Sequence, residues 1–236
     1  GIGSKTHQAV YPLLKEQRIP SFFVGSDLPE WTQPVRANVF GFMPTADTEA
    51  RVIGKYLTQN HKGAELIIWY AEKPAYLRAV KALTNELFGV SAKLLPGKTG
   101  RLTAEWILIT KQQPDLLVVL GNFSDQLDFL KASANINIPI YTGHALADSR
   151  LPEWLNSKLA ARVRVLTAYP LIVETEHPGY KLHQQILKEY ASRLSVNRWT
   201  LYGQAAAELM VEVFKRTGRS LSRQKAVIAA EKINKW

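Results

Sequence analysis

Short apolar runs alternate along this chain with longer segments in which apolar residues recur every three or four positions. The clearest run, Leu116 to Leu120, contains no polar residue, which is typical of a strand buried on both faces. Because helical periodicity fills the segments between such runs, the pattern predicts an α/β fold with parallel sheets. The predicted strands cover residues 20–24, 39–43, 65–70, 90–95, 115–120, 138–141 and 162–166.

Residues that favour helix termini mark several of the predicted helices. Ser4 is expected to cap a helix over 4–17, and Ser124 is the expected cap of a helix over 123–134. Further helices are predicted over 45–60, 74–88, 104–113 and 151–159. After Thr167 the alternation stops: residues 168–179 hold two prolines and no clear period, which indicates a connector. Three helices without intervening strands then follow, over 180–194, 200–217 and 222–233.

Polar residues gather where the predicted strands end and the next helices begin. These junctions are residues 1–6, 25–27, 70–72, 121–124 and 142–144. The carboxyl ends of parallel strands meet at one edge of a sheet, and helix N-termini there offer free backbone N–H groups. The series therefore predicts a cleft for a small molecule.

Composition excludes several classes of function. The 236 residues carry a formal net charge of +10, but the basic residues are dispersed, so a nucleic-acid surface is disfavoured. Cysteine is absent, and the five histidines show no metal-ligand spacing. There is no GxSxG elbow and no P-loop, so we expect neither an enzyme nor a bound metal or cofactor. No secretory signal is visible, and the apolar runs are too short to span a bilayer.

The order of the motifs resembles the type I periplasmic solute-binding proteins, the branched-chain amino acid receptor group of ABC transporters. Five segments carry the resemblance, and together they extend over nearly the whole chain: GIGSKTHQAVYPLLKEQRIPSFFVGSDLPE, ELIIWYAEKPAYLRAV, QQPDLLVVLGNFSDQLDFLKAS, IPIYTGH and TLYGQAAAELMVEVFKRTGRSLSR. Members of this family have two further β–α units before the position of Gly1, and strands after the last helix. The resemblance therefore implies a chain truncated at both ends, with an incomplete first lobe.

The resemblance implies two Rossmann-like lobes that close on a ligand about a hinge. Residues 1–44 and 173–218 would form the first lobe, and residues 45–172 and 219–236 the second. The implied function is that of a periplasmic, or otherwise extracytoplasmic, solute-binding protein of an ABC importer, with a membrane permease as its partner. It would capture a small polar or carboxylate-bearing metabolite, such as an amino acid or an organic acid. The alternatives are a sensory or regulatory ligand-binding domain of the same fold and, less favoured, a Rossmann-like transferase or hydrolase.

The resemblance also implies a set of ligand-binding residues at the junctions. For several of them a structural role competes: Ser4 could only cap its helix, Phe123 could belong to the core, and Tyr70 and Glu72 compete for one contact. Catalytic and metal-binding residues are not expected. The expected ligand-binding residues are Ser4, Lys5, Thr6, Ser26, Asp27, Tyr70, Glu72, Asn122, Phe123 and His144.

The loop at His144 departs from the family pattern. Amino-acid receptors carry a carboxylate in this loop to pair with the ligand ammonium, whereas Gly143-His144-Ala145 offers none. Either Glu72 or Asp47 supplies that charge, or the ligand is not an α-amino acid. Since His144 could donate to an anion, we expect an organic acid to bind better than its α-amino counterpart. A lone histidine is otherwise more often structural.

Overall fold

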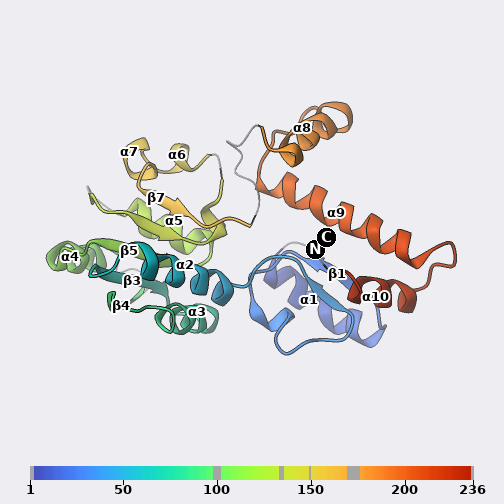
Figure 1. Cartoon of the computed structure of the whole chain (residues 1–236), viewed down its shortest axis with the longest axis horizontal. Coiled ribbons are helices and arrows are strands. Elements are labelled where there is room, and N and C mark those ends of the chain that lie inside the picture. Colours follow the sequence, from blue (N-terminus) through green and yellow to red (C-terminus); the bar gives the residue numbers. More distant parts are fainter. Residues whose placement is uncertain (1–2, 98–101, 133–135, 149, 169–175, 235–236) are drawn as a thin grey trace. The chain divides into compact units, whose positions relative to one another are not determined.

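The computed structural model describes residues 3–97, 102–132, 136–148, 150–168 and 176–234. The chain forms two compact units, whose elements are labelled in Figure 1. Unit 1 comprises Gly1–Thr45 and Thr175–Trp236, and unit 2 comprises Ala46–Glu174.

Unit 2 is built on a sheet of five parallel strands, which confirms the predicted α/β fold. The strand order is β4-β3-β5-β6-β7. The strands are β3 (Glu65–Ala71), β4 (Ser91–Gly97), β5 (Leu116–Leu120), β6 (Ile140–Thr142) and β7 (Val163–Val165). From β3 the chain moves outward to β4, then returns to β5 on the other side of β3 and continues to β6 and β7. The winding therefore reverses between β3 and β5, and open α/β sheets bind ligands at the carboxyl ends of such strands.

Strand register decides which helices cover which face of this sheet. Trp69, Val119 and Thr142 are paired across β3, β5 and β6, so their side chains point to one face. Trp69 and Thr142 contact residues of α5 there. Tyr141 points to the opposite face, where its hydroxyl lies 2.7 Å from Nε2 of His61, just after α2. The helices are α2 (Ala46–Asn60), α3 (Pro74–Thr84), α4 (Leu102–Gln112), α5 (Phe123–Lys131), α6 (Leu151–Trp154) and α7 (Ser157–Ala160).

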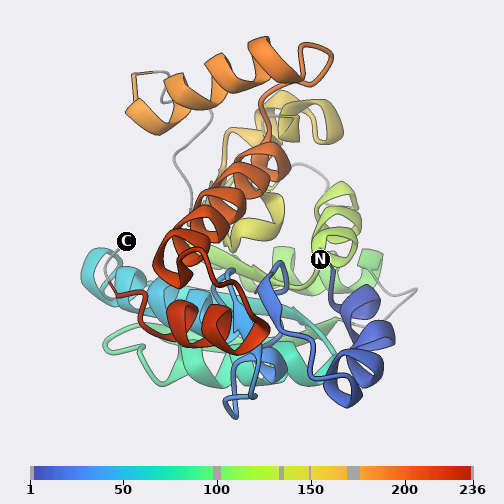
Figure 2. The same ribbon diagram turned by 90° about the vertical axis from the view of Figure 1, so that its right-hand side faces the viewer.

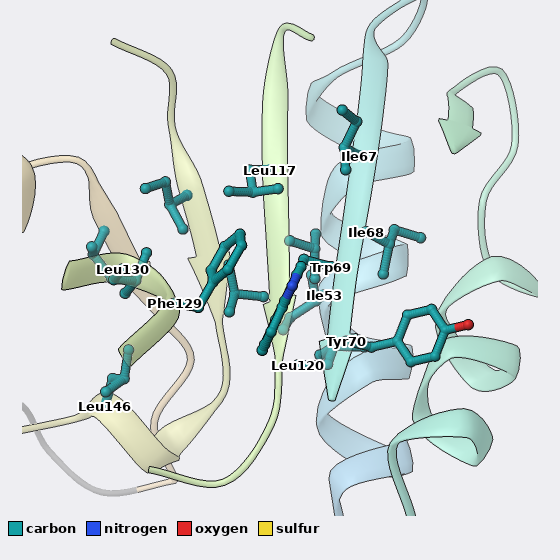
Figure 3. Close-up of a cluster of buried hydrophobic side chains, with 14 of the residues drawn as sticks. Ile53, Ile67, Ile68, Trp69, Tyr70, Leu117, Leu120, Phe129, Leu130 and Leu146 are labelled. Carbon is teal, nitrogen blue, oxygen red and sulfur yellow. The ribbon is translucent and has the colours of Figure 1, made fainter. Parts of the chain in front are cut away.

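A stack of three aromatic rings fixes α4 and α5 against the sheet. The Phe129 ring lies parallel to Trp69, with centroids 4.1 Å apart, and to Trp106, with centroids 4.5 Å apart. Figure 3 shows the Trp69 and Phe129 rings face to face on one side of the strands. The indole N–H of Trp69 donates to Glu105, and that of Trp106 donates to the Phe129 carbonyl, both at 2.7 Å. Burying these rings thus leaves neither indole nitrogen without an acceptor.

Unit 1 combines a two-stranded parallel sheet with helices from both ends of the chain (Figures 1 and 2). Its core joins Phe23 of β1 to Leu209 and Val213 of α9 and to Ala226 and Ala229 of α10. The elements are α1 (Ser4–Glu16), β1 (Ser21–Val24), η1 (Pro29–Trp31), β2 (Val39–Gly41), α8 (Pro178–Tyr190), α9 (Arg198–Thr217) and α10 (Arg223–Glu231).

The last helix lies in a different unit from the one expected. Residues 219–236 were expected in the second lobe, but α10 belongs to unit 1 and packs against α9 (Figure 2). The reason is the spacing of Ala226, Ala229 and Ala230, which places three small side chains on one helix face and allows close approach to α9. Ser222 caps this helix, since its hydroxyl accepts from the backbone N–H of Lys225 at 3.3 Å.

Unit 1 also buries a histidine among aromatic rings. His7 of α1 is 4% exposed, and its ring meets that of Trp31 edge-on with centroids 4.3 Å apart. The Arg36 guanidinium lies over the rings of Trp31 and Tyr11. Nε2 of His7 has no hydrogen-bond partner among the described residues. Burial, aided by the positive charge of Arg36, lowers the pKa of His7 below its ordinary value of 6.5.

We predict that Phe129→Ala lowers the free energy of unfolding by about 3 to 5 kcal/mol, because it removes the ring between two tryptophans and leaves a cavity. Urea denaturation followed by tryptophan fluorescence measures this loss. Phe88→Ala is the matched control, since Phe88 is 75% exposed, and it should change the free energy of unfolding by less than about 0.5 kcal/mol. Equal effects of the two variants would contradict the proposed importance of the stack.

We predict from the burial of His7 that the free energy of unfolding decreases in mild acid. A lowered pKa means that the unfolded chain takes up a proton at a higher pH than the folded chain does. The free energy of unfolding should therefore decrease as the pH falls below about 6.5, and His7→Phe should flatten this decrease. Thermal melting between pH 5 and 7.5 tests it, with the exposed His177→Asn as control because asparagine still caps α8. A slope unchanged in His7→Phe would show that His7 does not contribute.

Candidate functional site

The junctions after β5 and β6 are joined by a buried chain of hydrogen bonds. The Thr142 hydroxyl donates to the Gln126 side-chain oxygen, and the Gln126 amide donates to the Gly121 carbonyl at 2.5 Å. Thr142 is fully buried and Gln126 is 2% exposed, so both bonds are shielded from water. These bonds hold the Gly121 and Thr142 ends of the two strands in a fixed relation at the carboxyl edge of the sheet.

An ion pair joins the junction after β3 to the same edge. Nζ of Lys73 lies 2.8 and 2.6 Å from the two carboxylate oxygens of Asp125, in the first turn of α5. Asp125 also accepts from the Asn122 backbone N–H at 3.2 Å. Three consecutive strand ends of unit 2, those of β3, β5 and β6, are therefore connected by side chains.

Asn122 caps α5, where Ser124 was expected to do so. Its side-chain oxygen accepts from the backbone N–H of Asp125 at 2.9 Å and from the Ser124 hydroxyl at 2.8 Å. The prediction that Ser124 is the cap was wrong, because α5 begins at Phe123, which makes Asn122 the residue before the helix. The oxygen of Asn122 accepts hydrogen bonds at the helix terminus, so any hydrogen bond from its side chain to a ligand would have to come from its amide N–H groups.

Phe123 and Tyr70 both contact the core of unit 2. Phe123 is half-buried and meets the Trp154 ring edge-on, with centroids 5.1 Å apart. Tyr70 is 9% exposed, and Figure 3 shows its side chain on the opposite side of β3 from Trp69. Glu72, by contrast, is exposed at the end of this strand. Of Tyr70 and Glu72, which compete for one predicted ligand contact, only Glu72 is open to solvent. Ligand contact by Phe123 stays a prediction.

His144 is held by a carboxylate that the sequence reasoning missed. Oε1 of Glu49 accepts from Nδ1 of His144 at 2.5 Å and from the His144 backbone N–H at 3.3 Å. Glu49 lies in the first turn of α2 and is 7% exposed. Gly143-His144-Ala145 itself carries no carboxylate, but Glu49 of α2 brings one to His144. Whether Glu72 or Asp47 pairs with a ligand ammonium stays a prediction.

The close approach of Glu49 depends on a glycine. A Cβ atom added to Gly143 would lie 2.3 Å from Oε2 of Glu49, closer than any non-bonded contact allows. The backbone φ of Gly143 is −81°, so its conformation does not require glycine. The small residue leaves space for the carboxylate, and in the sequence this appears only as a glycine at the junction.

Asp47 lies in the first turn of α2, as Glu49 does, but on a different face of that helix. Positions two apart on a helix do not face each other, so Asp47 and Glu49 point in different directions. Asp47 is 6% exposed, and its Oδ1 has no hydrogen-bond partner within the described part of the chain.

In unit 1, Ser4 and Ser26 lie together at the start of α1. Their hydroxyl oxygens are 2.6 Å apart, and Ser26 also accepts from the Leu28 backbone N–H at 3.2 Å. Ser4 is the first residue of α1 and Gly3 is its N-cap, so the prediction that Ser4 caps the helix was wrong. Thr6 is exposed and Asp27 is half-buried, whereas the side chain of Lys5, like residues Gly1 and Ile2, lies outside the described residues.

Tyr202 of α9 fixes the loop that carries Ser26. Its hydroxyl donates to the Phe23 carbonyl at 2.5 Å, and burial raises the pKa of Tyr202 above its ordinary value. Phe23 has a φ of 53°, in the left-handed region that bulky residues rarely adopt. A Cβ on Gly25 would lie 2.9 Å from the Tyr202 ring. Sequence reasoning did not find Tyr202, because 179 residues separate it from its partner.

We predict that Thr142→Val loosens the β5 and β6 junctions, because the buried Gln126 oxygen loses its donor at a cost of about 1 to 3 kcal/mol. Amide hydrogen exchange should become faster at residues 121–123 and 142–144. Thr142→Ser keeps the hydroxyl and should preserve the slow exchange. Equal protection in the valine and serine variants would mean that the hydrogen bond does not hold the junctions.

Solved structures with this fold come from several bacterial receptors. An extracellular ligand-binding receptor from Verminephrobacter eiseniae superposes with a TM-score of 0.78 at 13% identity, over 97% of this chain and 68% of the receptor. A leucine binding protein from Thermotoga maritima gives 0.77 at 17% identity, over 98% and 67%. A solute binding protein from R. palustris, solved with benzoate, gives 0.70 at 15% identity, over 97% and 64%. The chain thus spans about two thirds of the length of each.

Comparison with curated protein sequences gave no match. Within the described residues, no helix is both long and apolar enough to cross a membrane. The sequence model of a family described as periplasmic binding protein matches residues 1–236, which is the whole chain. The chain therefore belongs to the periplasmic binding proteins, in their type I branch.

Proposed function

We propose that this chain is the ligand-binding part of an extracytoplasmic solute-binding protein that serves an ABC importer. It would capture a small polar metabolite, an amino acid or an organic acid, and deliver it to a membrane permease. The strongest support comes from the carboxyl edge of the sheet at the switch point of unit 2. There Lys73, Gln126 and Glu49 hold the ends of β3, β5 and β6 by hydrogen bonds from their side chains. A receptor needs loops whose shape is set before the ligand arrives, since ordering them on binding would cost affinity.

The polar groups at this edge suit recognition better than reaction. Asn122 and Glu49 are each fixed by hydrogen bonds to neighbouring backbone groups, and Thr142 and Gln126 satisfy each other. A receptor built this way releases its ligand unchanged. The names of two similar structures, a leucine binding protein and a benzoate complex, indicate that this fold accepts both amino acids and organic acids.

Calorimetry with a panel of amino acids and organic acids tests the proposal, together with mass spectrometry of any small molecule that copurifies. We expect at least one member to bind reversibly and to be recovered unchanged. Product that accumulates with time would support an enzyme, and a panel without any binder would reject the receptor.

We predict that Phe123→Ala weakens binding of that ligand by about 1 to 3 kcal/mol, because the ring lies at the start of α5 beside the strand ends. Phe88→Ala is the control, since it removes the same ring from an exposed position of the same unit and should leave affinity unchanged. Thermal melting separates binding from stability. A large fall in melting temperature with unchanged affinity would place Phe123 in the core alone.

A further inference from the structure

The turn between α9 and α10 brings together basic residues that the sequence spaces apart. α9 and α10 pack against each other, and the chain reverses direction between them (Figures 1 and 2). The last turn of α9, the linker and the first turn of α10 therefore form one surface of unit 1, which we call the basic turn (residues 214–225). No acidic residue occurs from Val213 to Ala230. The basic residues of this surface are Lys215, Arg216, Arg219, Arg223 and Lys225.

The basic turn is open to solvent, and most of its charge has no counterion from the protein. Each of its residues is exposed except Thr217, which is half-buried. Arg216 forms an ion pair with Glu212 at 2.6 Å, which leaves the other basic side chains without an acidic partner within the described residues. A surface with an excess of one sign of charge attracts groups of the opposite sign. The basic turn therefore favours an anionic partner.

Two of the arginines fix the shape of the basic turn through backbone carbonyls. Nη1 of Arg216 donates to the Lys232 carbonyl, just after α10, at 3.0 Å. Nη1 of Arg223 donates to the Gln17 carbonyl, just after α1, also at 3.0 Å. Gly218 ends α9 with a φ of 74°, which a side chain would disfavour. The cations whose side chains form no hydrogen bond in the described part of the chain are Lys215, Arg219 and Lys225.

Large apolar side chains are exposed beside these cations. Leu221 of the linker is 59% exposed, and Phe214 and Ile228 of the adjoining helices are exposed as well. Apolar side chains among cations match the interface of an anionic bilayer, where phosphates form the surface and acyl chains lie below it. A nucleic acid would use the cations but leave the aliphatic Leu221 and Ile228 in water, since it is bound through phosphates and bases. The combination therefore favours lipid.

We propose that the basic turn binds the surface of an anionic phospholipid bilayer. Lys215, Arg219 and Lys225 contact lipid phosphates, and Leu221 enters the apolar region below them. Charge attraction alone or one apolar group alone binds a membrane weakly, so the two act together. This inference does not depend on the ligand of unit 2. It adds a membrane surface to the partners of the proposed receptor.

Cosedimentation of the whole chain with lipid vesicles tests the proposal. Vesicles of phosphatidylcholine alone are compared with vesicles that contain about one third phosphatidylglycerol. We expect the chain to bind the anionic vesicles and not the neutral ones, and to bind them more weakly as the salt concentration rises. Equal binding to both kinds of vesicle, or binding to neither, overturns the proposal and leaves the receptor function standing.

Charge reversal locates the binding surface. The variant with Lys215→Glu, Arg219→Glu and Lys225→Glu should bind anionic vesicles at least about a hundredfold more weakly, because each cation near such a surface contributes to affinity. The control reverses three exposed lysines of unit 2 and changes the net charge equally; it should weaken binding less than about threefold. The control substitutions are Lys62→Glu, Lys111→Glu and Lys158→Glu. Equal losses in the two variants would mean that net charge alone causes binding, and would overturn the proposal.

A variant without a charge change keeps the proposal testable should the charge reversal prevent folding. Leu221→Ser should weaken binding to anionic vesicles about fivefold, since the leucine no longer enters the apolar region. Unchanged binding would contradict this contact. A single-stranded oligonucleotide provides the last comparison: if it binds the chain more tightly than the vesicles do, and loses affinity in the Lys215→Glu, Arg219→Glu, Lys225→Glu variant, the basic turn binds nucleic acid and the proposal fails.

Discussion

The burial of one strand, β5, determines the arrangement of unit 2. All five of its residues are buried, and it pairs with β3 on one edge and with β6 on the other. A strand that is apolar on both faces needs a helical layer on each, so the crossovers must distribute their helices over the two sides of the sheet. The Trp69–Phe129–Trp106 stack holds one layer, and the His61–Tyr141 bond ties the other to β6. The switch point between β3 and β5 is a consequence of this distribution.

The carboxyl edge of the sheet is held by helices of both layers, α5 on one face and α2 on the other. Two side chains hold the end of β6. Gln126 of α5 forms a hydrogen bond with Thr142, and Glu49 of α2 forms one with His144, two residues after Thr142. The register across the sheet places Thr142 on the face covered by α5. One junction is therefore fixed by side chains from two helices, so neither helix can shift without breaking a buried polar bond. Such a constraint suits a site that must recognise a ligand without rearranging first.

The sequence predicted the elements of the fold better than their partners. Apolar runs such as Leu116 to Leu120 identified the strands because burial on both faces leaves a local pattern. Junction residues were found for the same reason, since strand ends and helix starts are local. Glu49, Tyr202 and the placement of α10 were missed, because each depends on a contact with residues far away in the chain. Periodicity shows that a face is buried and does not show what covers it.

Two glycines at the junctions, Gly143 and Gly25, mark the places where the side chains of Glu49 and Tyr202 approach the backbone. Glycine at a strand end is usually interpreted as a turn residue, but Gly143 has an ordinary φ and would clash with Glu49 if it had a side chain. Gly25, which precedes Ser26, would clash with the Tyr202 ring in the same way. In both places the missing Cβ makes room for a side chain that a distant helix inserts. At both junctions, a glycine between a strand and a candidate ligand-binding residue marks the place where a side chain from a distant part of the sequence packs against the loop. The local sequence does not reveal which residue that is.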